Sequence, residues 1–465
     1  MIRYRRLNYI IPAGLIVLCG FFFGLISGCD QVRVSKYFEN GAVVTSAPIA
    51  TEIGVDVFNR GGNAFDVAVA VGFALAVVDP EAGNIGGGGF AVIRDGRTGT
   101  VRSLDFRETA PMAATETMFL DDSGRVIDNL SLIGAKSAGV PGTVAGLYEL
   151  WQQHGSMPWE ELVRISADLA DSGFVVDELL AVSLARHVDD LKRYPETARL
   201  FLPTGAPPQA GDRFVQEDLA RSLYQIAAEG PEVFYEGEIA AQIDSTMQTY
   251  DGLITLEDLA AYEPIWREPV HFRFDSLDIY SMALPSSGGL VLGQILEILE
   301  PYAFDQYTPD SPGYIRLFAE ASRLAFADRS VHMGDPAFYD VPGGLLDSAY
   351  LAQRRSLIPE SGAGSSSQIG PGTPLRSESP QTTHFSVCDR EGNMVALTYT
   401  LNGSFGSGVT VIDGGFLLNN EMDDFSIKPG VPNQFGLVGG EANKIEPGKR
   451  MLSSMTPTLV LQHGE

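Results

Sequence analysis

The stretch "PQTTHFSVCDREGNMVALTYTLN", residues 380–402, has the pattern of a β-hairpin. Its two halves alternate apolar and polar side chains as strands do, and "REGN" between them is typical of a turn. A three-residue loop at 390–392, with Gly392 left-handed, sets a register that places Thr382 opposite Thr400. The hairpin therefore predicts two threonine hydroxyls side by side where its first strand begins.

The residues before this hairpin, "PESGAGSSSQIGPGTPLRSESP" at 359–380, are rich in Ser, Gly and Pro and indicate a flexible linker. A threonine hydroxyl becomes a nucleophile when a histidine, a lysine or its own α-amino group takes its proton. An internal threonine has no free amine, so the last route requires a cut before Thr382, which an exposed linker permits. On spacing alone, a loop that runs into an ordinary hairpin is the preferred interpretation.

Composition and charge narrow the classes of protein. The chain has 465 residues, of which 45% are hydrophobic and 20% charged, enough apolar material for a large core. Its formal charge of −27 argues against a nucleic-acid partner, because binding to phosphate backbones depends on clustered Lys and Arg. We interpret the charge as favouring solubility.

The N-terminal residues 1–29 have the pattern of an export signal, with three arginines followed by an apolar run at 10–26. The ending "LISGC" is similar to a bacterial lipobox, in which Cys29 is lipidated and becomes the new N-terminus. An uncleaved membrane anchor is the alternative, because the apolar run is just long enough to span a bilayer. Either interpretation places the rest of the chain in the cell envelope, outside the cytoplasm.

Cysteine and histidine usage gives no sign of a disulfide or a metal centre. Cys19 lies within the leader and Cys388 stands alone in the body of the chain, so no intramolecular disulfide is expected in the mature protein. The six histidines are scattered and no HExxH motif is present. We therefore expect no metal and no cofactor.

The first third of the body predicts two helices and a strand. A helix is expected from Ala47 to Phe58, and a second, almost wholly apolar one begins at the cap Asn63 and ends at Asp79. The following "GNIGGGGFAVI" puts its glycines before a strand rather than between a strand and a helix. It therefore fails the test for a dinucleotide-binding fingerprint and indicates close backbone packing.

The central part of the chain is predominantly helical. Residues 140–270 alternate helical stretches with short connections, and "PVHFRFDSLDIYSMAL" at 269–284 predicts strands. Two further helices are expected at 288–300 and 314–330. No internal repeat is evident, so the sequence describes one mixed α and β body rather than an array.

The motifs "QTTHFSVCDREGNMVALTYTLNGSFGSG", "LLNNEMDDFSIKPGVPNQFGLVGG" and "KRMLSSMTPTLV" resemble those of γ-glutamyltranspeptidase, or glutathione hydrolase, an N-terminal-nucleophile hydrolase. The resemblance runs from about residue 40 to the end and includes "AGNIGGGGF", "DFRETAP" and "PSSGG". It implies an α+β fold, the four-layer αββα sandwich of the N-terminal-nucleophile hydrolase type.

The resemblance also implies a self-cleaving precursor. The chain would be cut between Gln381 and Thr382, which gives a large subunit, 30–381, and a small subunit, 382–465, that remain together as a heterodimer. Thr382 would then be the nucleophile and, through its new α-amine, the general base. Thr400 matches the family threonine that hydrogen-bonds the nucleophile, in agreement with the hairpin register.

A γ-glutamyl group carries an α-carboxylate and an α-ammonium, so its site needs a guanidinium on one side and carboxylates on the other. By resemblance, Arg107 of "DFRE" binds the carboxylate, and the hydroxyls of Ser453 and Ser454 assist it. Glu421 and Asp424 match the ammonium ligands, and Asn402 matches the amide beside them. Without the resemblance, "NNEMDDF" would be interpreted as a solvated loop or a weak calcium site.

The implied reaction transfers the γ-glutamyl group of glutathione or a related compound to water or to an amino-acid or dipeptide acceptor. A glutaryl or cephalosporin acylase is the nearest alternative, but Asp424 argues against it, because a glutaryl group has no ammonium to bind. A non-catalytic lipoprotein that binds γ-glutamyl compounds is a second alternative.

The sequence ends at "VLQHGE", whereas family members continue through a "GSPGGS"-type segment whose two glycine amides form the oxyanion hole. Loss of one such donor typically costs about 10²–10³-fold in turnover. We therefore expect the 465 residues to be a fragment of a longer gene product, poorly folded or inactive as they stand.

Overall fold

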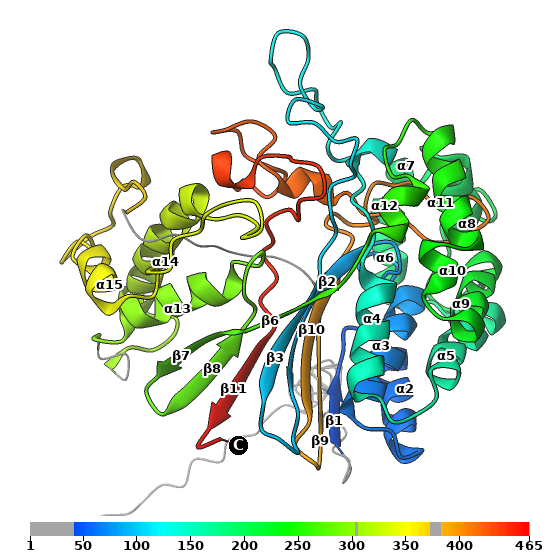
Figure 1. Ribbon diagram of the computed structural model, residues 1–465, viewed down its shortest axis with the longest axis horizontal. Coiled ribbons are helices and arrows are strands. Elements are labelled where there is room, and N and C mark those ends of the chain that lie inside the picture. The colour runs from blue at the N-terminus through cyan, green and yellow to red at the C-terminus, as the bar shows by residue number, and fades with distance from the viewer. Residues whose placement is uncertain (1–40, 303–305, 373–382, 465) are drawn as a thin grey trace, which may run out of the picture. The chain divides into compact units, whose positions relative to one another are not determined.

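The computed structural model describes residues 41–464, except 303–305 and 373–382 (Figure 1). The predicted leader with Cys29, the cleavage-site residue Gln381 and the nucleophile Thr382 lie outside the described residues. Within the described ranges, no helix is both long enough and apolar enough to cross a membrane.

The larger sheet has six antiparallel strands in the order β1-β9-β10-β2-β3-β6. Their bounds are β1 Gly41–Val44, β2 Gly88–Arg94, β3 Val101–Phe106, β6 Ile265–Arg267, β9 Thr383–Asp389 and β10 Met394–Thr400. The predicted hairpin is thus β9–β10, and it occupies the interior of the sheet rather than an edge.

The register of this hairpin is the predicted one. Pairs run from Met394 opposite Cys388 to Tyr399 opposite Thr383. The turn is the expected three-residue loop, in which Gly392 has a φ of 80°. The next pair in the same register would join Thr382 to Thr400, of which only Thr400 is described.

A second sheet of three antiparallel strands, β11-β8-β7, packs face to face with the first. Its strands are β7 Val270–Phe274, β8 Leu277–Ser281 and β11 Thr458–Gln462. Apolar side chains from both sheets form one buried cluster between them, which includes Phe90, Val92, Ala396 and Leu459. The two sheets are therefore the inner layers of the fold.

Helices cover the outer face of the larger sheet, where α3 packs on β9 and β10 and α4 on β2 and β3 (Figure 1). The helices of this part of the chain are α2 Pro48–Asn59, α3 Ala64–Val78, α4 Thr143–His154, α5 Trp159–Ser172, α6 Glu178–Arg186, α7 Val188–Leu191, α8 Pro195–Phe201, α9 Glu217–Glu229, α10 Glu232–Tyr235, α11 Glu238–Thr249 and α12 Leu256–Ala260. A two-stranded ribbon pairs β4 Phe174–Val175 with β5 Arg213–Phe214.

The helix α3 shows why this layer forms. Every residue from Ala64 to Val78 is buried, as its unbroken apolar run predicted. Asn63 caps it in a capping box, because its side chain accepts from the backbone N–H of Asp66 while the Asp66 carboxylate accepts from that of Asn63. The predicted cap is confirmed.

The second sheet is covered on its other face by α13 Gly288–Leu299, which contacts β7, β8, α14 Pro312–His332 and α15 Ser348–Arg355. The described chain therefore has the layer order helix, sheet, sheet, helix. The four-layer αββα arrangement and the α+β class expected from the sequence are confirmed.

The glycine cluster before β2 is explained by close backbone contact, as expected. A Cβ atom at any of five positions would lie within 2.5 Å of a backbone carbonyl oxygen of another segment: Gly83, Gly86, Gly87, Gly88 and Gly89. At Gly87 that oxygen belongs to Thr400, only 2.0 Å away. Only glycine allows the loop to lie so near the end of β10.

The segment predicted as a flexible linker is described from 359 to 372. There the backbone of Pro359, Gly364, Gly370 and Gly372 makes hydrogen bonds to side chains of α14 and α15. This half of the segment therefore follows a defined course, which its composition did not predict.

Candidate active site

Thr400 ends β10 at the edge where the glycine cluster enters the sheet. It lies opposite Gly88 of β2 and is 6% exposed. Its Oγ1 accepts a hydrogen bond of 2.9 Å from the backbone N–H of Asn402, which has a φ of 74°. The turn after β10 is thus tied to the hydroxyl that the sequence assigned to the site.

Arg107 follows β3 directly, and its backbone is held on both sides. Its N–H donates to Asp105 Oδ1 at 3.0 Å, while its carbonyl accepts from Tyr262 Oη and Arg450 Nη1, each at 2.9 Å. Because the backbone is fixed, the direction of the side chain is fixed as well.

The Arg107 guanidinium is fully buried between two of the acids that the sequence singled out. Its Nη1 lies 2.7 Å from Glu421 Oε2 and its Nη2 donates to Asp424 Oδ2 at 2.6 Å. Its Nε donates to the carbonyl of Met451 at 3.2 Å. Burial lowers the pKa of Arg107, but Glu421, the adjacent Glu108 and Asp424 outweigh burial and raise that pKa above its ordinary value.

Glu108 belongs to the same cluster and was not singled out from the sequence. Its carboxylate is completely buried, 3.5 Å from Arg107 Nη1, and burial raises its pKa to about 7. Burial also raises the pKa of Glu421 well above its usual range. In the sequence, the one signal for Glu108 was its position beside Arg107 in "DFRE". A sequence does not distinguish a buried carboxylate from an exposed one.

Several buried polar atoms of this cluster lack a hydrogen-bond partner. Within the described part of the chain, five buried atoms have no hydrogen-bond partner: both carboxylate oxygens of Glu108, both of Glu421, and Nη1 of Arg107. The contacts of Arg107 Nη1 with the two glutamates are ion pairs only. Buried polar atoms in native proteins are rarely left so. The cluster therefore has the chemistry of a binding site whose donors and acceptors are completed by a ligand.

The acidic turn "NNEMDDF" forms the far side of the cluster. It is a 3₁₀ turn, Glu421–Asp424, and is not the solvated loop that its composition alone suggested, since Glu421 and Asp423 are buried. Asp423 accepts from Ser131 Oγ at 2.7 Å and from the backbone of Gln434, and burial raises its pKa to about 6. Asp424 Oδ1 accepts from Asn433 Nδ2 at 3.1 Å.

The carboxylates of this turn do not gather with others of the described residues into a metal-binding group. Among residues 41–464, outside the two internal gaps, no group of three or more Asp, Glu, His or Cys side chains is arranged to hold a metal ion. The positive charge beside these carboxylates comes instead from the protein's own Arg107.

The remaining predicted residues surround the cluster. Asn402 Nδ2 donates to the carbonyl of Asn420, the residue before Glu421, at 3.0 Å. Ser453 and Ser454 are buried and follow Met451 by two and three residues, and Ser453 Oγ accepts from the backbone of Met455. Asn402 and the two serines therefore lie next to residues that contact Arg107.

A link through the sheet joins Thr400 to the charged cluster. A Cβ atom at Gly88, the partner of Thr400, would lie only 2.8 Å from the Glu108 carboxyl carbon. In Figure 1 the orange-to-red segments after β10, which carry 419–454, lie above the ends of β2 and β10. The structure thus brings the described predicted residues together at one end of the sheets.

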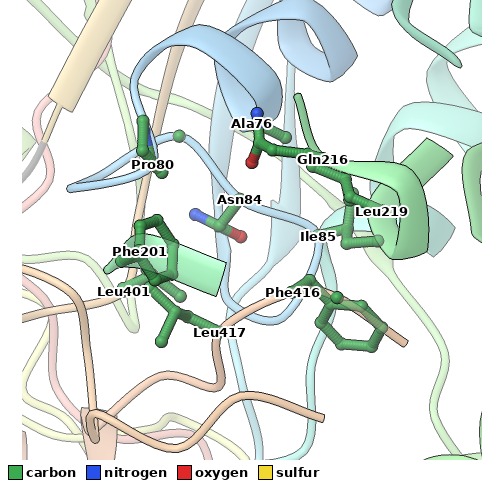
Figure 2. Close-up of a pocket in the computed structure, with 12 residues that line it drawn as sticks. Ala76, Pro80, Asn84, Ile85, Phe201, Gln216, Leu219, Leu401, Phe416 and Leu417 are labelled. Carbon is green, nitrogen blue, oxygen red and sulfur yellow. The ribbon is translucent and has the colours of Figure 1, made fainter. Parts of the chain in front are cut away.

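A small cavity behind the glycine loop is not part of this cluster. Figure 2 shows Asn84 among mostly apolar neighbours such as Pro80, Phe201 and Leu417. Its volume of about 20 Å³ fits one water molecule. The Asn84 amide is already used, with Oδ1 accepting from Gly87 N and Thr143 Oγ1 and Nδ2 donating to Ala82 O. The cavity is therefore too small for a substrate.

Comparison with known proteins agrees with this geometry. The family model described as gamma-glutamyltranspeptidase matches residues 50–465. A glutathione hydrolase proenzyme of Escherichia coli (strain K12) is 47% identical over 429 residues, which cover 92% of this chain and 74% of that protein.

Two solved structures extend the comparison. The γ-glutamyltranspeptidase of Helicobacter pylori has a TM-score of 0.71 and 42% identity, with 73% of this chain and 97% of that chain covered. A cephalosporin acylase from Bacillus halodurans has a TM-score of 0.82 and 28% identity, with 94% and 78% covered.

Proposed function

The chain belongs to the γ-glutamyltranspeptidase family of enzymes, with the N-terminal-nucleophile hydrolase fold, and from this premise we propose that it is a γ-glutamyltransferase and glutathione hydrolase. The observation that carries the proposal is the buried Arg107, held between Glu421 and Asp424 beside the end of β10. It supplies one cation and neighbouring anions at a single position, as a zwitterionic γ-glutamyl group requires.

Binding would exchange ion pairs within the protein for ion pairs with the substrate. The α-carboxylate of the γ-glutamyl group takes the guanidinium of Arg107, and the α-ammonium takes Glu421 and Asp424. Such an exchange keeps every buried charge compensated, whereas a neutral acyl group would leave the protein's own pairs in place. Glu421 Oε1, which has no hydrogen-bond partner and is not the oxygen paired with Arg107, is an acceptor that the ammonium would use.

The chemical step uses Thr382 as the N-terminal residue of a small subunit, 382–465, cut from a large subunit that ends at Gln381. The free α-amine, with a reference pKa of about 7.7–8.0, takes the hydroxyl proton. The Thr382 oxygen then attacks the γ-carbonyl, a γ-glutamyl ester forms, and the amine of the donor leaves with the proton. Water or the amine of an amino acid or dipeptide attacks the ester and regenerates the hydroxyl.

Two hydroxyls and an amide assist in this scheme. Thr400 hydrogen-bonds Thr382, in line with the register of the hairpin, and Asn402 lies beside the ammonium ligands. Ser453 and Ser454 support the substrate carboxylate. The donors are glutathione and related γ-glutamyl amides, and the scheme needs no cofactor.

Export of the chain belongs to the proposal as well. The leader, 1–29, directs the protein to the bacterial cell envelope, where Cys29 carries a lipid anchor. Mass spectrometry of the protein from membranes should find a lipid on Cys29 as the first residue. An unmodified chain that begins at Met1 would instead favour the uncleaved anchor.

A direct comparison of two chromogenic substrates tests the activity with the protein expressed from its complete gene. γ-Glutamyl-p-nitroanilide and glutaryl-p-nitroanilide differ only in the α-ammonium group. We expect kcat/KM to favour the γ-glutamyl compound by at least about 100-fold, because the glutaryl compound leaves Glu421 and Asp424 without the ammonium. Equal or reversed rates would instead support an acylase, the function named for the B. halodurans neighbour.

A further inference from the structure

Residues 364–372, the described end of the segment that precedes the hairpin, are held against α14 and α15. Gly364 N donates to the buried Glu320 Oε1 at 2.7 Å, and Gly370 O accepts from Arg354 Nη1 at 3.2 Å. Ile369 between them packs on the apolar cluster of α13, α14 and α15. The segment is thus attached by polar and apolar contacts along its length.

The attachment ends at Gly372, where both backbone groups are bound. Its N–H donates to Asp328 Oδ1 at 2.8 Å, and its carbonyl accepts from His332 Nε2 at 3.0 Å, so Nε2 carries the ring proton. Asp328 and His332 are four residues apart and share one face of α14. A Cβ atom at Gly372 would lie 2.3 Å from Tyr350 Oη, so this position accepts only glycine without rearrangement.

The groups that hold Gly372 form one buried network. Asp328 is 1% exposed; its Oδ2 accepts from Tyr350 Oη at 2.5 Å and its Oδ1 lies 2.8 Å from Arg354 Nη2. Arg354 also donates to the carbonyl of Leu324. A buried ion pair adds little net stability compared with apolar packing, so its presence points to a positional role.

A short path connects this network to the charged cluster. Asp335, three residues beyond the end of α14, accepts from the backbone N–H of Arg450 at 3.0 Å. The next residue, Met451, provides the carbonyl that binds Arg107 Nε. The helix α14 therefore carries two of the groups that hold Gly372, and just past its end a carboxylate that holds the segment beside Arg107.

We propose that Asp328, His332, Tyr350 and Arg354 are an anchor that fixes the precursor chain at Gly372 and so presents the Gln381–Thr382 bond for self-cleavage. The inference rests on the proposed function, in which this bond is cut. The anchor and β9 fix the chain at both ends of 373–382, which reduces the entropy lost when the bond reaches a reactive geometry. After the cut, only 373–381 extend beyond the anchor.

The step that the anchor serves is an intramolecular acyl shift. The Thr382 hydroxyl oxygen bonds to the Gln381 carbonyl carbon, the Gln381–Thr382 amide bond breaks, and the released nitrogen takes the hydroxyl proton. Water then hydrolyses the ester, which gives the Gln381 carboxylate and restores the Thr382 hydroxyl. The anchor residues touch none of these atoms; they are positioning residues.

The test measures self-cleavage and turnover separately. The protein is expressed from its complete gene, and conversion of precursor into two chains is followed by denaturing electrophoresis. Asp328→Asn and Gly372→Ala should slow cleavage about ten- to hundredfold, the ratio expected for loss of one charge-assisted hydrogen bond. The kcat and KM per cleaved site, measured with γ-glutamyl-p-nitroanilide, should stay within about twofold of wild type.

Two further variants separate anchoring from general stability. Tyr350→Phe removes the hydroxyl that donates to Asp328 and keeps the ring, so it should slow cleavage as Asp328→Asn does, with a smaller loss of stability. Asp177→Ala removes the N-terminal cap of α6, in the other helical layer, and should lower the melting temperature while cleavage stays at the wild-type rate.

The outcomes are distinguishable. Wild-type cleavage rates in both Asp328→Asn and Gly372→Ala would overturn the anchor, as would kcat losses in the cleaved enzyme equal to the losses in cleavage rate. If Asp328→Asn fails to fold, Gly372→Ala and Tyr350→Phe decide. A wild-type protein that never yields Thr382 at an N-terminus would overturn the proposed function, and the anchor with it.

Discussion

Replacement of Arg107 by lysine is the sharpest test of the substrate site, because it keeps the charge and removes the planar fork. The wild-type guanidinium reaches Glu421 at 2.7 Å, Asp424 at 2.6 Å and the Met451 carbonyl at 3.2 Å. An ammonium reaches one or two of these partners as a point charge. Removal of the charge with alanine would be less informative, because an uncompensated buried carboxylate costs about 3–5 kcal/mol in stability.

The expected magnitude follows from the contacts that a substrate carboxylate would lose. A guanidinium binds a carboxylate through two parallel N–H groups, and an ammonium in the same place supplies one. One hydrogen bond to a charged group is worth about 1.5–3 kcal/mol, which corresponds to about a 10- to 150-fold rise in KM. We expect kcat to change less than about threefold, because Arg107 binds the end of the substrate remote from the scissile amide.

The assay is steady-state hydrolysis of γ-glutamyl-p-nitroanilide by the cleaved enzyme, with thermal unfolding measured in parallel. Arg354→Lys is the matched control, since Arg354 is also buried and ion-paired, to Asp328, but lies in the other helical layer. It should lower stability without a rise in KM. An unchanged KM in Arg107→Lys, or an equal rise in the control, would refute the assignment of Arg107 to the substrate carboxylate.

Three further variants test neighbouring residues. Asp424→Asn should raise KM for the γ-glutamyl substrate about 10- to 100-fold and leave hydrolysis of the glutaryl analogue unchanged; equal effects on both would remove Asp424 from ammonium recognition. Thr400→Val should slow both self-cleavage and turnover about tenfold with a stability loss of about 1 kcal/mol, and wild-type rates would show that its hydroxyl is not needed. The pKa of Glu108 is about 7 in the folded protein, whereas its ordinary value in an unfolded chain is 4.5. Between these pH values only the folded state keeps the proton on Glu108, so the free energy of unfolding falls as pH rises. Glu108→Gln has no such pH dependence, so its melting temperature should exceed that of the wild type at pH 8 but not at pH 4. A higher melting temperature at both pH values would contradict the raised pKa of Glu108.

The hairpin and the buried helix α3 were predictable because their determinants are local, whereas the four-layer fold was expected only from the resemblance to the family. Alternation along β9 and β10 and a three-residue loop with a left-handed Gly392 fix the register without knowledge of other segments. The apolar run of α3, with Asn63 as its cap, likewise determines both its bounds and its burial. Patterns with one strong period leave few alternatives.

The pairing of charges within the site was not predictable, because it depends on distant contacts. Arg107 and Asp424 were assigned to opposite ends of a ligand, and the structure shows that they contact each other. Glu108 escaped notice because its burial involves residues distant in the sequence, such as Gly88 of β2 and Gly139. Composition also misjudged the residues that lead to Gly372, which has no side chain and therefore approaches Tyr350 closely.

The central claim is that Thr382 becomes an N-terminus. Intact-mass analysis and N-terminal sequencing of the protein expressed from its complete gene measure this directly, with Thr382→Ala prepared in parallel. We predict two chains in the wild type, the smaller of which begins at Thr382, and a single uncut chain in the variant. A wild-type protein that turns over γ-glutamyl amides as one uncut chain, or a variant cut at the same place, would contradict it.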